Sequence, residues 1–182
     1  MSDLKLPAQT QVVIIGGGVI GCSVAYHLTK LGWTDVVLLE RKELTCGTTW
    51  HAAGLVGQLR ATRNMTMLAQ YTSELFAGLE AETGQATGLK QHGSVSVAPD
   101  PERFEELKRG ASMAKCFGLE VEVITASEAQ NLHPYLNIED LCGAVFSPKM
   151  DRPTPSTPPV HWLKGHGIEA LRFLRISEFR VF

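Results

Sequence analysis

A glycine-rich turn between two apolar runs constrains the fold of this chain more than any other feature. The β-branched run 11–15 is followed at once by Gly16, Gly18 and Gly21, which have the spacing GxGxxG. Apolar residues then recur at helical spacing until a second apolar run, 35–40, begins. This order predicts a strand, a helix and a second parallel strand, joined by a right-handed crossover. Both strands are apolar on both faces, which is typical of the middle of a parallel sheet.

The glycines of this turn match the chemistry of a dinucleotide site. Gly16 permits a tight turn, Gly18 lets the backbone approach a pyrophosphate, and Gly21 allows close packing of helix on strand. Glu40 ends the second strand, nineteen residues after Gly21, where a carboxylate accepts hydrogen bonds from ribose hydroxyls and disfavours a 2′-phosphate. The pattern predicts that FAD or NAD binds here rather than NADP. The alternative is a glycine-rich turn that binds no dinucleotide and has an acidic residue at this spacing by chance.

Composition narrows the class of protein. The 182 residues are 44% hydrophobic and 20% charged, as in a soluble globular domain or part of a larger one. Because 17 basic residues face 19 acidic ones without a block of either sign, we expect no nucleic-acid partner. The four cysteines are far apart and form no CxxC, so we expect neither a metal site nor disulfides. No apolar run approaches the roughly 20 residues of a membrane span, and we expect a cytoplasmic protein without a membrane segment.

The rest of the chain to residue 149 alternates between helical and strand periods. Predicted helices cover 65–83, 101–117 and 127–132, and predicted short strands cover 94–97 and 121–124. Ser127 is the expected N-cap of the third helix. The first of these helices is expected to bury one apolar face, formed by Met67, Leu68, Tyr71, Leu75, Phe76 and Leu79.

The small, polar segment after the second strand carries a resemblance to a known family. Residues 43–55, ELTCGTTWHAAGL, resemble the FAD-attachment segment of the sarcosine and dimethylglycine dehydrogenases, within the D-amino-acid-oxidase-like flavoproteins. The likeness continues through 57–60, 79–84 and 143–148 and covers about residues 10–149. The runs GTT and QLR within it favour sarcosine dehydrogenase of the two.

The resemblance implies a fold and a domain division. The fold would be an α/β, Rossmann-like FAD-binding domain of the glutathione-reductase type, truncated, with the beginning of an inserted substrate domain. Residues 1–84 would form the N-terminal part of the FAD-binding domain, and residues 85–149 the start of the substrate domain.

The resemblance also implies a set of cofactor-binding residues. His51 would bond covalently to the 8α-methyl carbon of the flavin, which makes the flavin a better hydride acceptor. The alternative for His51 is a loop histidine whose ring bonds to the backbone. The alternative for Thr48 and Thr49 is a role in a turn or as an N-cap. The alternative for Arg41 is a solvated position. The full set of expected cofactor-binding residues is Gly16, Gly17, Gly18, Ile20, Gly21, Glu40, Arg41, Thr48, Thr49 and His51.

The family's activity would be the oxidation of small N-methylated amino acids, sarcosine to glycine first. Hydride would pass from the carbon beside the amine nitrogen to the flavin, and an electron-transfer protein or a quinone would accept the electrons. Tetrahydrofolate would serve only the full-length family. The alternatives are a dimethylglycine dehydrogenase and a non-catalytic, flavoprotein-like regulatory subunit. No catalytic residue is assigned.

The likeness ends within two residues of Pro148. Four of the nine prolines then fall between residues 153 and 159. Reading the codons one base out of frame restores the Asp-Gly and Asp-Pro pairs of the family, and the genetic code forces the glycine between Met150 and Asp151. We therefore expect residues 150–182 to be a frame-shifted or divergent tail without a native fold, which would make the chain an incomplete, inactive fragment. A genuine proline-rich tail is the alternative.

Overall fold

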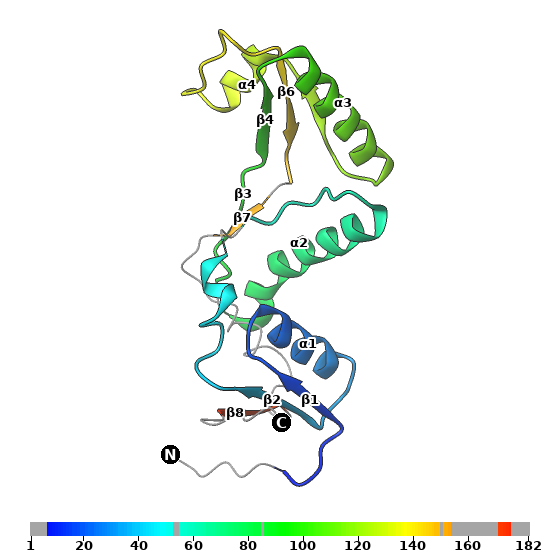
Figure 1. Ribbon diagram of the computed structural model, residues 1–182, viewed down its shortest axis with the longest axis vertical. Helices are drawn as coiled ribbons and strands as arrows, with labels where there is room; N and C mark the ends of the chain where they lie inside the picture. Colours follow the sequence, from blue (N-terminus) through cyan, green and yellow to red (C-terminus); the bar gives the residue numbers. More distant parts are fainter. Residues whose placement is uncertain (1–6, 53–54, 85, 150, 154–170, 176–182) are drawn as a thin grey trace. The chain divides into compact units, whose positions relative to one another are not determined.

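The computed structural model describes residues 7–52, 55–84, 86–149, 151–153 and 171–175 (Figure 1). Most of the predicted tail, 150–182, therefore lies outside the described residues. The elements in chain order are β1 (Val12–Ile15), α1 (Val19–Lys30), β2 (Val36–Glu40), the 3-10 turn η1 (Thr48–His51), α2 (Arg63–Thr83), β3 (Leu89–Gln91), β4 (Ser94–Ala98), α3 (Pro101–Cys116), β5 (Glu122–Ile124), α4 (Ala126–Leu132), β6 (Gly143–Ser147), β7 (Asp151–Pro153) and β8 (Leu171–Arg175).

The chain divides into two compact units that share one helix. The first unit contains β1, α1, β2, η1, the end of α2 from Phe76 onward, and β8. The second contains the start of α2 up to Leu75 and the elements from β3 to β7. The predicted domain boundaries after residues 84 and 149 stay predictions.

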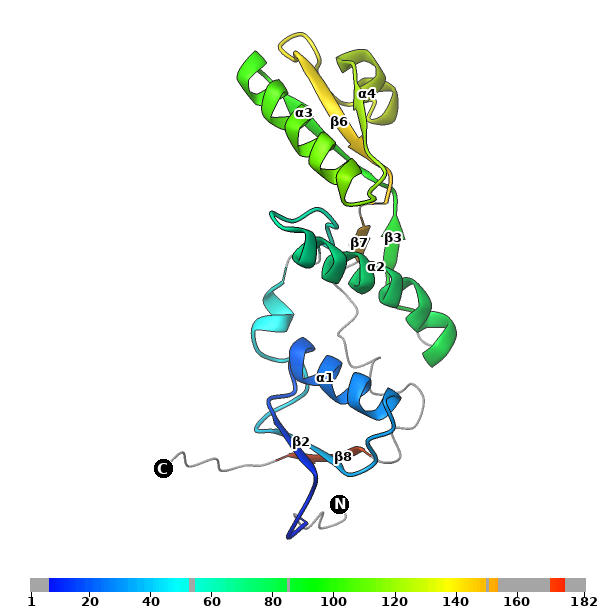
Figure 2. The same ribbon diagram turned by 90° about the vertical axis from the view of Figure 1, so that its right-hand side faces the viewer.

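The first unit confirms the predicted βαβ arrangement and the α/β fold. Its sheet is parallel in the order β1-β2-β8, and Val36 of β2 pairs with Val12 on one side and Leu171 on the other. Helix α1 lies on one face of the sheet (Figure 2), where Ala25 packs among Ile14, Val36 and Leu38. Two small residues of the helix, Gly21 and Ala25, let α1 approach the sheet closely.

The prediction that both strands are buried on both faces is confirmed for β2 and wrong for β1. Val37 and Leu39 of β2, on the face away from α1, are 1% and 9% exposed. Val13 and Ile15 of β1 are 50% and 69% exposed. The reason is position: β2 lies between two strands, whereas β1 is an edge of the described sheet and no described element covers its second face.

The second unit contains the antiparallel sheet β4-β6-β5 and a separate pairing of β3 with β7. Helix α3 begins at the N-cap Asp100, whose carboxylate accepts the Arg103 N–H at 2.7 Å, and Pro101 lies in its first turn. Its residues Ala111 and Ala114 pack against the sheet. The predicted helices and strands of this unit are all present within a few residues.

Two predictions about helix ends and faces are wrong. Helix α4 is capped by Thr125, not Ser127, because Thr125 and Glu128 form a reciprocal capping box. The predicted apolar face of α2 is confirmed only toward its C-terminal end, where Leu79 is buried, and is wrong at Met67, Leu68 and Tyr71, which are exposed. Thr66 and Ser73 are buried instead. The hydroxyls of Thr66 and Ser73 form hydrogen bonds with segment 57–60. The side of α2 that carries these two residues is therefore buried through polar contacts. Among the described helices, none is both long enough and apolar enough to span a membrane.

Candidate cofactor-binding site

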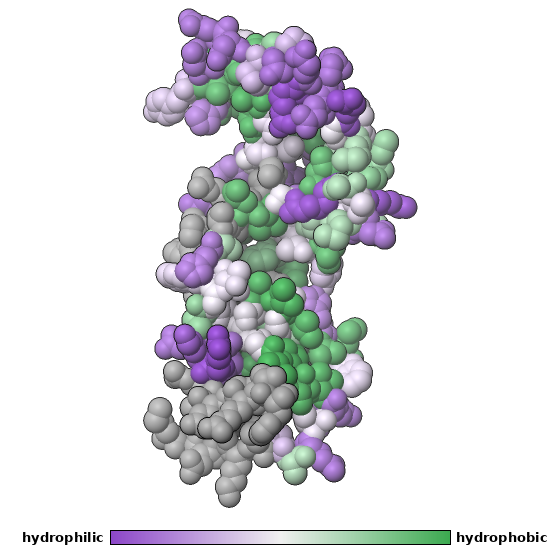
Figure 3. Space-filling model, viewed as in Figure 1, coloured by the Kyte–Doolittle hydropathy of each residue, from purple (hydrophilic) through white to green (hydrophobic). Residues whose placement is uncertain are grey.

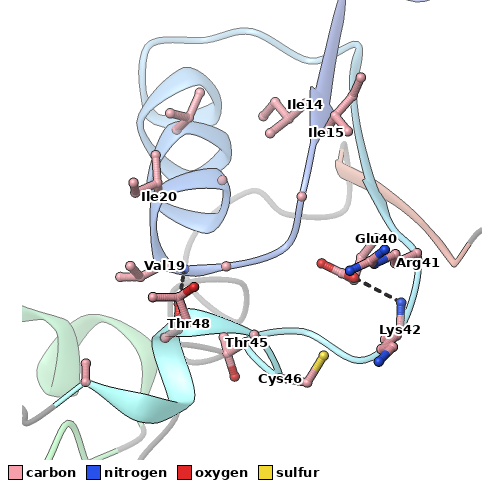
Figure 4. Close-up of a pocket in the computed structure, with 17 residues that line it drawn as sticks. Ile14, Ile15, Val19, Ile20, Glu40, Arg41, Lys42, Thr45, Cys46 and Thr48 are labelled. Carbon is pink, nitrogen blue, oxygen red and sulfur yellow. Dashed lines mark hydrogen bonds between the residues drawn. The ribbon is translucent and has the colours of Figure 1, made fainter. Parts of the chain in front are cut away.

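A cleft of about 640 Å³ lies at the carboxyl ends of β1 and β2, beside the start of α1 (Figure 4). Clefts at this edge of a parallel sheet are where α/β proteins bind their ligands. Gly17 and His51 do not line the cleft. The predicted residues that do line it are Gly16, Gly18, Ile20, Gly21, Glu40, Arg41, Thr48 and Thr49.

Two positions of the glycine turn require glycine, Gly21 because of packing against backbone and Gly16 because of its backbone conformation. A Cβ on Gly21 would lie 1.9 Å from the carbonyl oxygen of Gly16, so the helix can approach the strand only with glycine there. Gly16 itself has φ +104°, in the region that favours glycine. A Cβ on Gly17 would lie 2.4 Å from the Leu44 side chain. Glycine at these positions lets an anionic ligand approach the N-terminus of α1 closely.

Gly17 supports the turn from behind rather than lining the cleft. Its buried peptide is bonded on both sides: its N–H donates to Glu40 Oε2 at 2.7 Å, and its carbonyl oxygen accepts the Thr45 N–H at 2.9 Å. The Cys22 thiol also donates to that carbonyl oxygen, with Sγ 3.4 Å away. Burial and the nearby charge of Glu40 raise the pKa of Cys22 to about 11, which keeps this thiol neutral.

Glu40 is held at the end of β2 by backbone donors. Its Oε1 accepts the Lys42 N–H at 2.9 Å, in addition to the bond from Gly17. Partial burial works to raise the pKa of Glu40, but the N–H donors of Lys42, Gly17 and Arg41, with the Arg41 charge, outweigh it and lower the pKa below 4.5. The side chain is therefore an ionised acceptor at neutral pH, suited to ligand hydroxyl groups.

Thr45 lines the cleft and belongs to the predicted segment 43–55, although it is not among the individually predicted cofactor-binding residues. It is 4% exposed and has φ +64°, a left-handed conformation that is unusual for a β-branched residue. Its N–H bond to Gly17 holds this conformation in place. Cys46, Gly47 and Ala52 of the segment 43–55 that resembles an FAD-attachment segment also line the cleft, as does Lys42 just before it.

The two predicted threonines lie in η1, at the far side of the glycine turn. Thr49 Oγ1 accepts the Val19 N–H at 2.9 Å, a bond drawn at Val19 in Figure 4. Trp50 and His51 follow directly and are exposed, Trp50 by 65%. Among the described residues, the His51 ring has no hydrogen-bond partner.

The cleft has an apolar wall on the α1 side. Ile20 is 78% exposed and Val24 is 43% exposed, and both line the cleft. Figure 3 shows apolar surface, in green, over α1. Within the described part of the chain, no cluster of His, Cys, Asp or Glu side chains is arranged to hold a metal ion. The site combines a helix N-terminus, a carboxylate and apolar surface, an arrangement suited to a nucleotide rather than to a metal.

Comparisons with known proteins agree with this geometry. The sequence pattern of the DAO family, described as FAD dependent oxidoreductase, matches residues 11–152. Human mitochondrial sarcosine dehydrogenase is 44% identical over 144 residues, covering 79% of this chain and 16% of that protein. The mouse mitochondrial pyruvate dehydrogenase phosphatase regulatory subunit is 44% identical over 147 residues, covering 81% and 17%. Rat mitochondrial dimethylglycine dehydrogenase is 40% identical over 140 residues, covering 77% and 16%.

A solved structure gives the same fold. L-proline dehydrogenase from P. horikoshii superposes with a TM-score of 0.82 at 24% identity, over 93% of this chain and 45% of that one. At this identity the likeness establishes the fold alone. The chain spans about a sixth of the length of the curated relatives it matches.

Proposed function

Because this chain belongs to the family of FAD-dependent oxidoreductases, we propose that its cleft binds FAD through the adenosine and pyrophosphate portion. The observation that carries the proposal is the hydrogen bond between the glycine turn and Glu40. The Gly17 N–H donates to the Glu40 carboxylate at 2.7 Å, and this bond fixes the ribose acceptor relative to the turn that meets the phosphates. The residues present fit the group: glycines stand where a Cβ would close the turn, and the carboxylate is ionised.

Each predicted residue takes a role from its place in the cleft. Gly16, Gly18 and Gly21 let the backbone and the α1 N-terminus approach the pyrophosphate, while Gly17 supports the turn from behind. Glu40 accepts the ribose hydroxyls and disfavours a 2′-phosphate through its charge.

The remaining residues act around this centre. Ile20 supplies apolar surface at the mouth of the cleft. Arg41 lies beside the adenosine side, and Thr48 and Thr49 supply hydroxyl groups toward the phosphates. None of these is proposed as a catalytic residue.

The proposed reaction of the whole protein is the oxidation of a small N-methylated amino acid, sarcosine first. Bound FAD supplies the acceptor for the hydride that leaves the carbon beside the amine nitrogen. Similarity to sarcosine dehydrogenase at 44% identity supports this substrate class. Dimethylglycine is the second substrate candidate, supported by the 40% identical relative. An electron-transfer protein or quinone as acceptor, tetrahydrofolate as a cofactor of longer relatives and a cytoplasmic location stay predictions.

We also propose that His51 anchors the flavin covalently. A ring nitrogen of His51 would form a bond to the 8α carbon, while one proton from the 8α methyl group and the imidazole proton, with two electrons, pass to the flavin ring. An electron acceptor then reoxidises the ring. The exposure of His51, two residues from the hydroxyl of Thr49 at the cleft, supports this role.

The test is retention of flavin after denaturation. The chain is incubated with FAD, precipitated with acid, and the washed pellet is examined for flavin fluorescence. We expect fluorescence in the wild type and in His92→Ala, an exposed histidine of the second unit, and none in His51→Ala. Fluorescence retained in His51→Ala would assign the attachment elsewhere, and a wild-type pellet without flavin would remove the covalent link.

A second candidate function is that of a non-catalytic regulatory subunit. The relative of that description has the same 44% identity as sarcosine dehydrogenase, so identity does not separate the two. The Trp50-His51 pair favours the dehydrogenase, because the resemblance assigns this histidine to the attachment of a flavin that accepts hydride. A chain that binds FAD reversibly and never covalently would favour the regulatory function.

A further inference from the structure

Helix α1 begins without a cap of its own. Its N-cap residue is Gly18, which has no side chain to accept a hydrogen bond from the first turn. The first amides of a helix have no acceptor within the helix, so they need one from elsewhere. Thr49 supplies it: its Oγ1 accepts the Val19 N–H at 2.9 Å, from thirty residues further along the chain.

The close approach of Thr49 depends on Gly18. A Cβ on Gly18 would lie 3.3 Å from Thr49 Oγ1, tighter than most contacts of a side-chain carbon. A second bond holds the same segment to the turn, because the Thr45 N–H donates to the Gly17 carbonyl oxygen at 2.9 Å. Thr45 is held by its backbone, whereas Thr49 accepts the Val19 N–H through its side chain.

We propose that Thr49 is a positioning residue, which fixes η1 on the N-terminus of α1 and thereby sets the place of His51 relative to the nucleotide. The inference rests on the proposed function and deepens it. A threonine hydroxyl has one proton and two acceptor positions, so the bond from Val19 leaves the proton available to a phosphate oxygen. Thr49 and His51 lie in the same short element, η1, so the position of Thr49 also sets the position of the backbone that carries His51.

The test compares Thr49→Val, which keeps the shape and removes the hydroxyl, with Thr49→Ser, which keeps the hydroxyl. Thr72→Val is the matched control, because the Thr72 hydroxyl donates to the Leu68 carbonyl oxygen within α2, away from the cleft. Three quantities are measured on the full chain: hydrogen exchange of the peptide 46–52 without FAD, the Kd for FAD, and the rate of acid-stable flavin incorporation.

We expect Thr49→Val to raise the hydrogen-exchange rate of peptide 46–52 about tenfold and the Kd for FAD about tenfold. A tenfold change is what the loss of one hydrogen bond to a helix amide should cause. Flavin incorporation falls at least as much. Thr49→Ser restores all three to within about threefold of the wild type, and Thr72→Val leaves them unchanged.

Two results would overturn the inference. In the first, Thr49→Val has the same exchange rate of 46–52 and the same Kd for FAD as the wild type. In the second, Thr49→Ser changes these quantities as much as Thr49→Val does. Failure of the proposed function has a different signature. In that case the wild type binds no FAD, while exchange of 46–52 measured without FAD still reports whether Thr49 holds η1.

Discussion

The glycine turn and the η1 turn are two sides of one cleft, and the chain fixes them to different degrees. In the glycine turn, packing and backbone bonds leave no alternative: Gly21 touches Gly16, and the Gly17 peptide is bonded on both sides. At η1 the link to the turn is the hydroxyl of Thr49, and His51 beyond it is exposed. The nucleotide side is therefore fixed by its own packing, whereas the side proposed to meet the flavin is held by the side chain of Thr49 and, earlier in the segment, by the backbone of Thr45.

The largest expected effect comes from breaking the glycine turn itself. Gly21→Ala places a Cβ 1.9 Å from the Gly16 carbonyl oxygen, so α1 must move away from β1. We expect a loss of about 3 kcal/mol in the free energy of unfolding, typical of severe overpacking, and FAD binding at least about 100-fold weaker. Urea unfolding and FAD titration measure the two effects.

Gly78→Ala is the control for that experiment. Gly78 lies in α2 with nothing within 4 Å of an added Cβ, so alanine should stabilise the helix by up to about 1 kcal/mol. FAD affinity should not change. If Gly21→Ala behaved like Gly78→Ala, the turn would be far more tolerant than its packing indicates.

A middle-sized effect is expected at Glu40, which joins the turn to β2. Glu40→Gln removes the charge that accepts the N–H groups of Gly17 and Lys42, and we expect FAD binding to weaken about tenfold. Because the pKa of Glu40 is lowered in the fold, its stabilising contribution is present above about pH 4.5 and is lost as the pH falls through the lower folded value.

The pH dependence gives the control for Glu40. Urea unfolding of the wild type and Glu40→Gln should differ by a constant amount above about pH 5 and converge at lower pH. A difference that persists unchanged into acid would mean that the carboxylate charge contributes nothing to holding the turn.

The smallest effect should come from a residue outside both turns. Tyr26 is 2% exposed, and its hydroxyl donates to Glu82 at 2.7 Å and accepts from Lys30 at 3.1 Å, tying α1 to the end of α2. Tyr26→Phe should cost about 1 kcal/mol in urea unfolding without changing FAD affinity, and Tyr135→Phe, 95% exposed, should cost nothing. Weaker FAD binding in Tyr26→Phe would show that the turn depends on α1 as a whole.

Local patterns made the β1-α1-β2 part of the first unit and the helix α3 predictable, but not β8, which lies in the segment expected to have no native fold. The alternation of apolar runs with GxGxxG needs only neighbouring residues, so the βαβ unit and Glu40 at its end followed directly from the sequence. The N-cap of α4 was equally available, because Thr125 and Glu128 have the capping-box spacing, yet Ser127 was preferred. That error came from overlooking a signal that was present.

Other features depend on contacts between distant segments and had no local signal. The left-handed Thr45 and the bond from Val19 to Thr49 form only when the segment after β2 folds across the glycine turn. The exposed apolar residues of α2 have a related cause. The helical period is as predicted, but hydrogen bonds that segment 57–60 donates to Thr66 and Ser73 determine which side of the helix is buried. Periodicity predicts that a helix has two faces, and tertiary contacts decide which one is covered.

The order of the parallel sheet has a consequence for synthesis on the ribosome. Strand β2 finds its first partner, β1, just before it in the chain, whereas its second partner, β8, begins only at Leu171. All residues that line the cleft have been made by Ala52, so at ordinary elongation rates β8 follows on the order of 10 s later. During that interval the edge of β2 that pairs with β8 is without its partner strand, although every residue that lines the cleft has already been made.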